Sequence, residues 1–325
     1  MEIILLALGG LGLFLYAVSS LSDTLRDLLG DRTKDILSKF TGNLFTSILT
    51  GLVATTILDS SSAVIILAIV MINAKVLTFR QALGIVMGAN IGTTFSSQLI
   101  AFDIGKFSPI PIFIGLVLTV ISKSEKISQT AKVLLYFGIL FFGLYTMERA
   151  VEPLRDDVRF SSWMAVLENP GKGALTGAFV TLIIQSSSAT VGMVITLAKK
   201  GLISLAASLA VMLGAELGTC ADTLLATIKS NRQALKTGLF HLIFNFTSII
   251  IGLMLFPFFV QFVEWFSSGA SLERKIANGH MFFNLVGVLV FIPLVGIIEK
   301  LLNRWLPDKL EVIRDHNFQA KKVSA

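Results

Sequence analysis

The sequence predicts an all-α membrane protein with two inverted-topology repeats, each containing a re-entrant helical hairpin and a broken transmembrane helix. Three observations support this fold class. Hydrophobic residues make up 54% of the 325 residues, charged residues make up 15%, and the mean hydropathy is +0.80. Such a composition is typical of chains whose solvent is the bilayer. The chain also repeats itself at a fixed offset, and a polar serine word interrupts one apolar stretch in each half.

Seven stretches are apolar and long enough to cross a bilayer as helices, since a crossing needs roughly 17–25 residues. They are residues 2–21, 78–101, 107–122, 131–148, 202–228, 237–264 and 280–302. Segments 23–40 and 149–168 are charged and partly amphipathic. We therefore expect these two segments to lie along the membrane interfaces.

The internal repeat is seen when residues 12–96 are placed on residues 138–222, a shift that needs no gap. Ser60-Ser61-Ser62 falls on Ser186-Ser187-Ser188, and Gly88, Gly92 and Thr93 fall on Gly214, Gly218 and Thr219. Shared polar words inside hydrocarbon are costly and indicate function, whereas shared Leu, Ile and Val would not. We divide the chain into repeat 1 (1–126), repeat 2 with extra C-terminal helices (127–305) and a cytoplasmic tail (306–325).

The serine words lie inside stretches 44–75 and 170–200, each of which is two short apolar pieces. A piece of about 12 to 15 residues does not cross the bilayer by itself. Each stretch is therefore predicted to be a re-entrant hairpin with its tip near mid-membrane. Such a tip is tolerated where it is buried in protein or lines a wet cavity.

Orientation follows from the crossings and from the basic residues. Three predicted crossings separate equivalent points of the two repeats, and this odd number inverts the second repeat. The loops on one side, together with the C-terminus, hold eighteen Lys and Arg, and the opposite loops hold nine. The positive-inside rule then puts the N-terminus outside and the C-terminus in the cytoplasm of a multi-pass inner or plasma membrane protein. The first hairpin would enter from the cytoplasm and the second from outside.

The hairpin tips carry groups for ions of both signs. The N-terminus of the second half-helix and its serine hydroxyls suit an oxyanion, while free carbonyls, hydroxyls and an Asp or Gln oxygen suit a hard cation. The predicted anion ligands are Ser60, Ser61, Ser62, Ser186, Ser187 and Ser188, and the predicted cation ligands are Asp59, Asn90, Thr93, Gln185, Glu216 and Thr219. The glycines of the second word would loosen stretches 78–101 and 202–228, although such glycines also allow helices to pack closely.

Other classes of protein fit poorly. The basic residues lie in short loops and form no single patch, so nucleic acid is not an expected partner. One cysteine and three histidines show no zinc-ligand spacing, and no cofactor is expected. No serine has a His or Lys at an evident helical spacing, so we do not expect an enzyme. His241 and His280 recur in the same pattern and are interpreted as helix-to-helix hydrogen-bonding residues, and Glu148 is expected at an interface.

At these words the sequence resembles the sodium-phosphate cotransporter family, the type II sodium-dependent phosphate transporters and their bacterial relatives. Gln185-Ser186-Ser187-Ser188 and the word from Gly88 to Thr93 match the family pattern, and the similarity covers nearly the whole chain. The resemblance implies inorganic phosphate as substrate and sodium as coupling ion. Asp59 and Glu216 depart from the pattern, which has Gln and Asn there. A carboxylate beside an anion needs a cation or a proton, so we expect Asp59 to ligate sodium, with proton coupling as the rival.

The predicted function is a secondary active symporter that takes up inorganic phosphate with sodium by alternating access. One alternative is a sodium- or proton-coupled transporter of sulfate or a carboxylate, and an alternative of another class is an ion channel. The expected partners are phosphate, sodium ions and the lipid bilayer. The sequence leaves the oligomeric state open, with a dimer as one arrangement.

Overall fold

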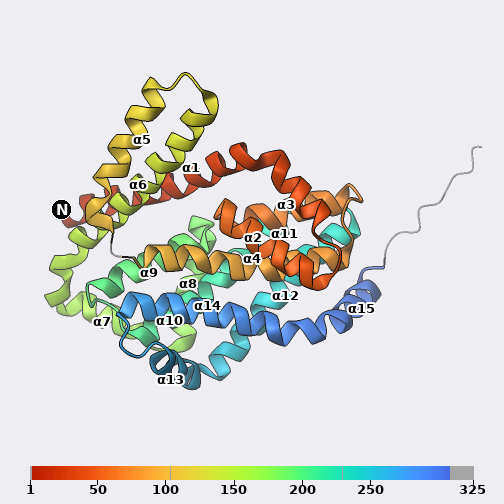
Figure 1. The fold of residues 1–325 in the computed structure, drawn as a ribbon. Helices are drawn as coiled ribbons and strands as arrows, with labels where there is room; N and C mark the ends of the chain where they lie inside the picture. Colours follow the sequence, from red (N-terminus) through yellow and green to blue (C-terminus); the bar gives the residue numbers. More distant parts are fainter. Residues whose placement is uncertain (1, 103, 229, 308–325) are drawn as a thin grey trace, which may run out of the picture.

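The computed structural model describes residues 2–102, 104–228 and 230–307, and within these ranges the protein is entirely helical (Figure 1). The α-helices are α1 (Glu2–Lys39), α2 (Leu44–Leu58), α3 (Ser61–Asn73), α4 (Phe79–Ile100), α5 (Pro109–Ile121), α6 (Glu125–Val151), α7 (Val158–Val166), α8 (Pro170–Ile184), α9 (Ser187–Lys199), α10 (Leu205–Gly218), α11 (Cys220–Ala226), α12 (Arg232–Met254), α13 (Phe256–Phe266), α14 (Leu272–Phe291) and α15 (Val295–Trp305). Three short 3₁₀ helices are η1 (Gly105–Phe107), η2 (Glu152–Asp156) and η3 (Ile292–Leu294). The predicted tail lies outside the described residues from 308 onward.

Five helical segments among the described residues are long and apolar enough to cross a membrane, and a sixth is added if α4 and η1–α5 form one bent span. The five are Glu2–Leu29, Glu125–Asp156, Leu205–Ala226, Arg232–Met254 and Leu272–Trp305. Segments 78–101 and 107–122, predicted as two crossings, are counted here only together, as one bent pair. The inversion of the halves requires these two segments to cross separately and stays a prediction. In segment 107–122, α5 has only 13 residues. At 1.5 Å per residue it is roughly 20 Å long, shorter than the hydrocarbon core.

Helix α1 extends past the predicted crossing at 2–21. Residues 23–40, expected along a membrane interface, do not start a new helix, because α1 continues unbroken from Glu2 to Lys39. No proline interrupts this stretch. The Thr24 hydroxyl donates a hydrogen bond to the Ser20 carbonyl oxygen of the same helix at 2.7 Å. The charged second half of α1 is thus held at a defined place beside the other helices.

The two predicted hairpins are helix pairs, α2 with α3 and α8 with α9. Asn43 caps α2 and Asn169 caps α8, each by accepting a backbone N–H three residues later. Both first helices end at a residue in the left-handed conformation, Asp59 at φ 52° and Gln185 at φ 61°. The following serine in each pair then caps the second helix. The two halves therefore fold the serine words into the same local turn.

Each hairpin packs against the long helix that follows it, α2 on α4 and α8 on α10. A Cβ on Gly88 would overlap the carbonyl oxygen of Ile48, and a Cβ on Gly214 would overlap that of Ala174. These two contacts are related by the same 126-residue shift as the sequence repeat. The glycines therefore serve close approach of the helix backbones, the use known from membrane helix pairs.

The glycine words do not open the first of these helices. Helix α4 runs without a break from Phe79 to Ile100, so the prediction of a broken helix at 78–101 is wrong. Helix α2 packs directly against the glycines of α4. The Thr93 hydroxyl donates a hydrogen bond to the Ala89 carbonyl oxygen of the same helix at 3.0 Å. In the second half the helix is interrupted at Thr219 alone, between α10 and α11.

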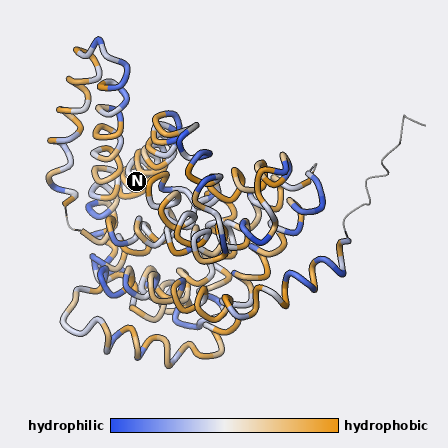
Figure 2. Tube along the Cα trace, turned by 45° about the vertical axis from the view of Figure 1, so that its right-hand side comes forward, coloured by the Kyte–Doolittle hydropathy of each residue, from blue (hydrophilic) through white to orange (hydrophobic). Residues whose placement is uncertain are grey.

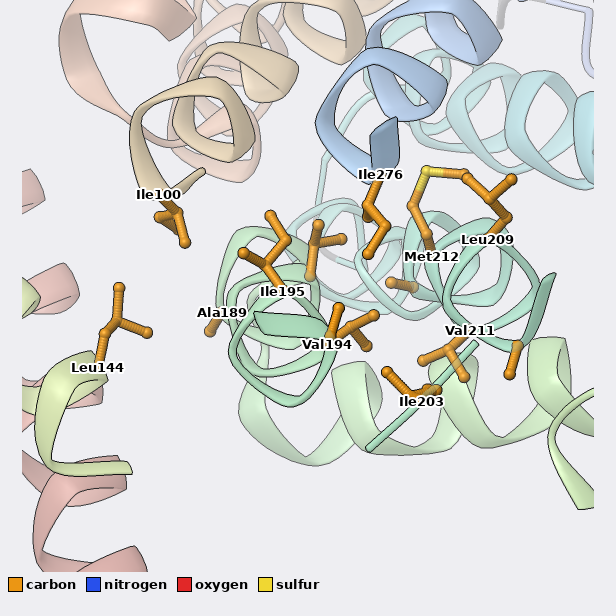
Figure 3. Close-up of a cluster of buried hydrophobic side chains, with 14 of the residues drawn as sticks. Ile100, Leu144, Ala189, Val194, Ile195, Ile203, Leu209, Val211, Met212 and Ile276 are labelled. Atoms are coloured by element: carbon orange, nitrogen blue, oxygen red, sulfur yellow. The ribbon is translucent and has the colours of Figure 1, made fainter. Parts of the chain in front are cut away.

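The largest hydrophobic cluster surrounds α9 and α10 and draws in side chains from α1, α4, α6 and α14 (Figure 3). Ile195 and Met212 are fully buried there. The outer helices carry many exposed apolar side chains, among them Phe113 and Phe179, and Figure 2 shows hydrophobic colour over most of the outer trace. An apolar exterior on a packed helical core is what a bilayer as solvent requires. The buried α9 consequently holds the second serine turn inside the protein.

Candidate functional site

One polar cavity of about 310 Å³ lies between the two serine turns. Its walls come from the first turn, the second turn, the α10–α11 junction and one face of α1. The lining residues are Asp59, Ser60, Ser61, Ser62, Ile184, Gln185, Ser186, Ser187, Ser188, Thr219, Leu15, Val18, Ser19, Ser22, Asp23 and Arg26. The fold therefore brings together nine of the twelve residues that sequence analysis selected.

The backbone of each turn presents a helix N-terminus to this cavity. Helix α3 begins at Ser61 and α9 begins at Ser187, and the first N–H groups of a helix have no partner within it. Ser60 accepts the Ala63 N–H and Ser186 accepts the Ala189 N–H, each at 3.2 Å. The oxygens of these two serines thus cap the helices. Their hydroxyl hydrogens, like the other serine hydroxyls, can still be donated to an anion.

Asp59 joins the first turn to α4, because the Ser96 hydroxyl donates a hydrogen bond to its carboxylate. Behind the turn lies a second, small cavity of about 30 Å³, whose polar lining residues are Asp59, Ser96 and Ser188. The rest of its wall is apolar and includes Phe14 and Phe141. A space of this size holds a single water or ion. Its one carboxylate and two hydroxyls carry oxygen atoms, the ligand type that hard cations prefer.

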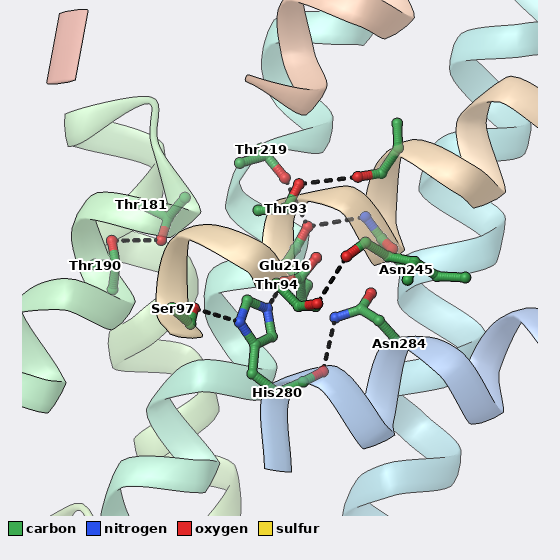
Figure 4. A network of polar contacts seen from close by, with 12 residues as sticks. Thr93, Thr94, Ser97, Thr181, Thr190, Glu216, Thr219, Asn245, His280 and Asn284 are labelled. Carbon is green, nitrogen blue, oxygen red and sulfur yellow. Dashed lines mark hydrogen bonds and ion pairs between the residues drawn. The ribbon is translucent and has the colours of Figure 1, made fainter. Parts of the chain in front are cut away.

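Three of the predicted cation ligands do not line either cavity. Asn90 donates to the Val86 carbonyl oxygen at 2.9 Å, and Thr93 is likewise bonded to its own helix. Glu216 is buried, and its Oε1 lies 2.6 Å from Nε2 of His280 (Figure 4). Thr219 does line the large cavity, with its hydroxyl donating to the Glu216 carbonyl oxygen at 3.0 Å.

The histidines connect helices, as the sequence interpretation expected. His280 on α14 contacts Glu216 on α10, and its Nδ1 lies 2.7 Å from the Ser97 hydroxyl on α4 (Figure 4). His241 on α12 places Nδ1 2.8 Å from the Thr223 hydroxyl on α11. Both side chains are buried, and these contacts satisfy them. The helices behind the cavity are thereby tied to one another.

Glu148 lies inside the protein, where only 8% of the residue is exposed. Its Oε1 is 3.1 Å from Nζ of Lys199 at the end of α9. This ion pair links the end of the second hairpin to α6, the helix that packs against α1.

Sequence reasoning missed two contributions to the site. The first is the face of α1 with Ser19, Ser22, Asp23 and Arg26, whose i, i+3, i+4 spacing is the signal that marks one side of a helix. The second is Asp222 on α11, whose carboxylate interacts with the Ser62 side chain of the first turn. Asp222 falls on Ser96 in the repeat, and a carboxylate in a predicted crossing was itself a signal.

Comparison with known families decides the class of protein. The sequence model of the Na⁺/Pi-cotransporter family matches residues 13–149 and 156–286. The chain belongs to the Na⁺/Pi-cotransporter family. Each matched segment contains one of the two serine turns. The protein is therefore a member of a transporter family, not of an enzyme family.

Relatives of this chain differ in their names. It is 28% identical over 305 residues to "Uncharacterized protein YqeW" of Bacillus subtilis, which covers 91% of this chain and 96% of the relative. It is 27% identical over 291 residues to "Putative inorganic phosphate export protein YjbB" of Escherichia coli K12, or 88% of this chain and 52% of the relative. The chain thus spans about half the length of YjbB.

A more distant relative is "Sodium-dependent phosphate transport protein 2A" of Mus musculus, 24% identical over 143 residues, or 39% of this chain and 22% of the relative. No solved structure shows significant similarity to the chain.

Proposed function

We propose that this family member carries inorganic phosphate across the membrane together with sodium ions, by alternating access, with the cavity between the serine turns as the phosphate site. The observation that supports it most is that both serine turns line one polar cavity. Two helix N-termini facing the same space favour an anion between them.

Phosphate suits this cavity because its oxygens accept several hydrogen bonds at once. The hydroxyls of Ser61, Ser62, Ser187 and Ser188 and the first N–H groups of α3 and α9 are donors on opposite walls. Binding by neutral donors and helix ends leaves the anion's charge only partly compensated. Cations must therefore bind nearby for the loaded cavity to move through a low-dielectric environment.

Sodium is proposed to bind at Asp59 in the small cavity behind the first turn. Its carboxylate, with the hydroxyls of Ser96 and Ser188, offers oxygen ligands to a hard cation. Because Asp59 and Ser188 also line the large cavity, a cation here would lie next to the bound anion. That adjacency couples the two ions, since an ion of each sign lowers the cost of binding the other.

Alternating access is proposed to use the two halves as inverted units. The halves share the turn conformation at Asp59 and Gln185 and the glycine contacts between hairpin and long helix. Inverted units of this kind bind substrate at their interface and expose it by rocking. The proposed orientation has the N-terminus outside and the C-terminus in the cytoplasm.

The direction of net transport has two candidates. Uptake follows if the inward sodium gradient drives the cycle, and export is favoured by the name of the YjbB relatives. Phosphate content of cells that express the protein, measured in sodium and in potassium medium, separates them. A sodium-dependent rise supports uptake, and a fall supports export.

The deciding experiment is uptake of labelled phosphate into proteoliposomes under an imposed sodium gradient. We expect sodium-driven uptake in the native protein, and a loss of at least tenfold in phosphate affinity for Ser62→Ala and for Ser188→Ala. Ser162→Ala, on exposed α7, is the matched control and should behave as native. Equal uptake under potassium would exclude sodium as the coupling ion. Uptake of sulfate or a carboxylate that phosphate does not inhibit would exclude phosphate as the substrate of the site.

A further inference from the structure

One face of α1 forms a wall of the large cavity. Leu15, Val18, Ser19, Ser22 and Arg26 stand at positions i, i+3, i+4, i+7 and i+11 of the helix, so they share this face. The residues change from apolar to hydroxyl-bearing to charged along the helix. The Ser22 hydroxyl donates to the Leu58 carbonyl oxygen at 3.1 Å, which fastens α1 to the end of α2 just before the first serine turn.

Arg26 is the one basic side chain among the residues that line this cavity in the described part of the chain. On α1 it forms an ion pair with Asp23, with Nη1 3.9 Å from Oδ1. The two side chains are 55% and 66% exposed, so this pair is long and solvated. Pairs of this kind contribute little free energy and exchange partners readily.

Arg26 also lines a second cavity, of about 530 Å³, between the later part of α1 and helix α3. Asp27, Thr33 and Lys34 line that cavity from α1, and Ala63 and Val70 line it from α3. The two cavities share Arg26 and no other residue. Its side chain therefore stands at the boundary between the serine turns and a wider, partly polar cavity beside α3.

We infer that Arg26 binds the transported oxyanion at this boundary and orients it toward the serine turns. This inference rests on the proposed function. The serine hydroxyls and helix ends are neutral donors, whereas a guanidinium carries a full charge and a planar fork that matches two oxygens of a phosphate. The contact with Asp23 is weak enough for an arriving anion to displace it. An anion that moves between the two cavities passes this side chain.

The charges around Arg26 favour direct contact with the anion over long-range attraction. Asp23 and Asp59 line the same cavity as Arg26, and Asp27 and Lys34 line the neighbouring one. The local field is thus mixed, and a diffuse excess of positive charge does not exist to concentrate anions there. The effect of Arg26 should consequently be short-ranged and should depend on the shape of its fork.

The test measures the kinetics of phosphate transport in proteoliposomes for Arg26→Gln, Arg26→Lys and a control, Arg149→Gln. Arg149 is a matched control because it forms a pair of the same spacing with Glu152, 3.8 Å long and equally exposed, on α6 away from both cavities. We expect Arg26→Gln to raise the phosphate KM at least tenfold at saturating sodium. Arg26→Lys should recover only part of that loss. In both Arg26 variants the maximal rate should change by less than twofold, and the melting temperature should change by a degree or so. Arg149→Gln should match native protein.

The outcomes separate this inference from the proposed function. If native protein shows no sodium-driven phosphate transport, the proposed function fails first. If native protein transports phosphate and Arg26→Gln keeps the native KM, the inference about Arg26 is wrong while the proposed function stands. A full recovery by Arg26→Lys would reduce the role of Arg26 to charge alone and overturn the orienting role. A fall in maximal rate and stability with unchanged KM would show a structural role instead.

Discussion

Replacing Gly214 by alanine tests the helix packing that holds the second serine turn. A Cβ at this position would overlap the carbonyl oxygen of Ala174 on α8, a backbone atom that cannot rotate away. Restoring an ordinary contact requires α8 and α10 to separate by roughly 1.5 Å. Overpacking of this kind costs about 1–3 kcal/mol, and the rigid neighbour places this case near the upper value.

The expected readout is the melting temperature of the purified protein in detergent. A loss of about 3 kcal/mol lowers the Tm of a chain of 150–250 residues by roughly 6–12 °C, and a longer chain shows the smaller shift. We therefore expect a fall of about 6 °C for Gly214→Ala. Gly88→Ala should give a similar fall, because the equivalent contact with Ile48 is equally close.

Gly9→Ala is the control, since a Cβ on this α1 residue meets no atom within 4 Å. Its Tm should not fall. An unchanged Tm for Gly214→Ala would refute the close approach of α8 and α10, and with it the shared packing of the two halves. A fall for Gly214→Ala but not for Gly88→Ala would show that the halves are packed differently.

Two further changes test the groups around the cavity. Asp59→Asn keeps the shape of the first turn but removes the carboxylate charge. The sodium concentration for half-maximal phosphate uptake should therefore rise at least tenfold. A sodium titration of uptake measures this midpoint, and an unchanged midpoint would exclude Asp59 as a sodium ligand. His280→Ala leaves the Glu216 carboxyl buried without its imidazole partner, which should cost about 1–3 kcal/mol, the cost of a buried polar group that loses its hydrogen-bond partner. Thermal unfolding measures this loss, Glu216→Gln should lose less because its amide can still bond to the imidazole, and native stability of His280→Ala would contradict the interpretation of the pair as a helix tie.

Much of the hairpin architecture could be predicted from local sequence. Asn43 and Asn169 mark where the first helices begin, and the serine words mark where they end and the next helices begin. These signals act within a few residues of the chain, through capping and through residues that leave helical conformation. The internal repeat supports these capping and turn signals, because they occur twice at one spacing.

Contacts between distant segments were beyond that kind of reasoning. The glycines of α4 are compatible with a broken helix and also with close packing of a second helix. The position of α2 against them shows that they serve close packing. Glu216 was selected as an ion ligand for its charge, yet the fold places His280 against it from 64 residues away. Length alone could not tell that segment 107–122 would form a helix of 13 residues, bent away from α4.

The sequence by itself determined that this is a membrane protein of two similar halves, that each half turns at a serine word, and that it resembles the sodium-phosphate cotransporters. Composition, capping residues and the periodicity of apolar residues are properties of the sequence itself, so they can be recognised without knowledge of the fold. The tertiary structure shows both turns at one cavity, and it alone decided that the charged part of α1 with Arg26 completes its wall. The physical reason is that a cavity is made by surfaces from segments far apart in the chain, and their relative positions come from packing.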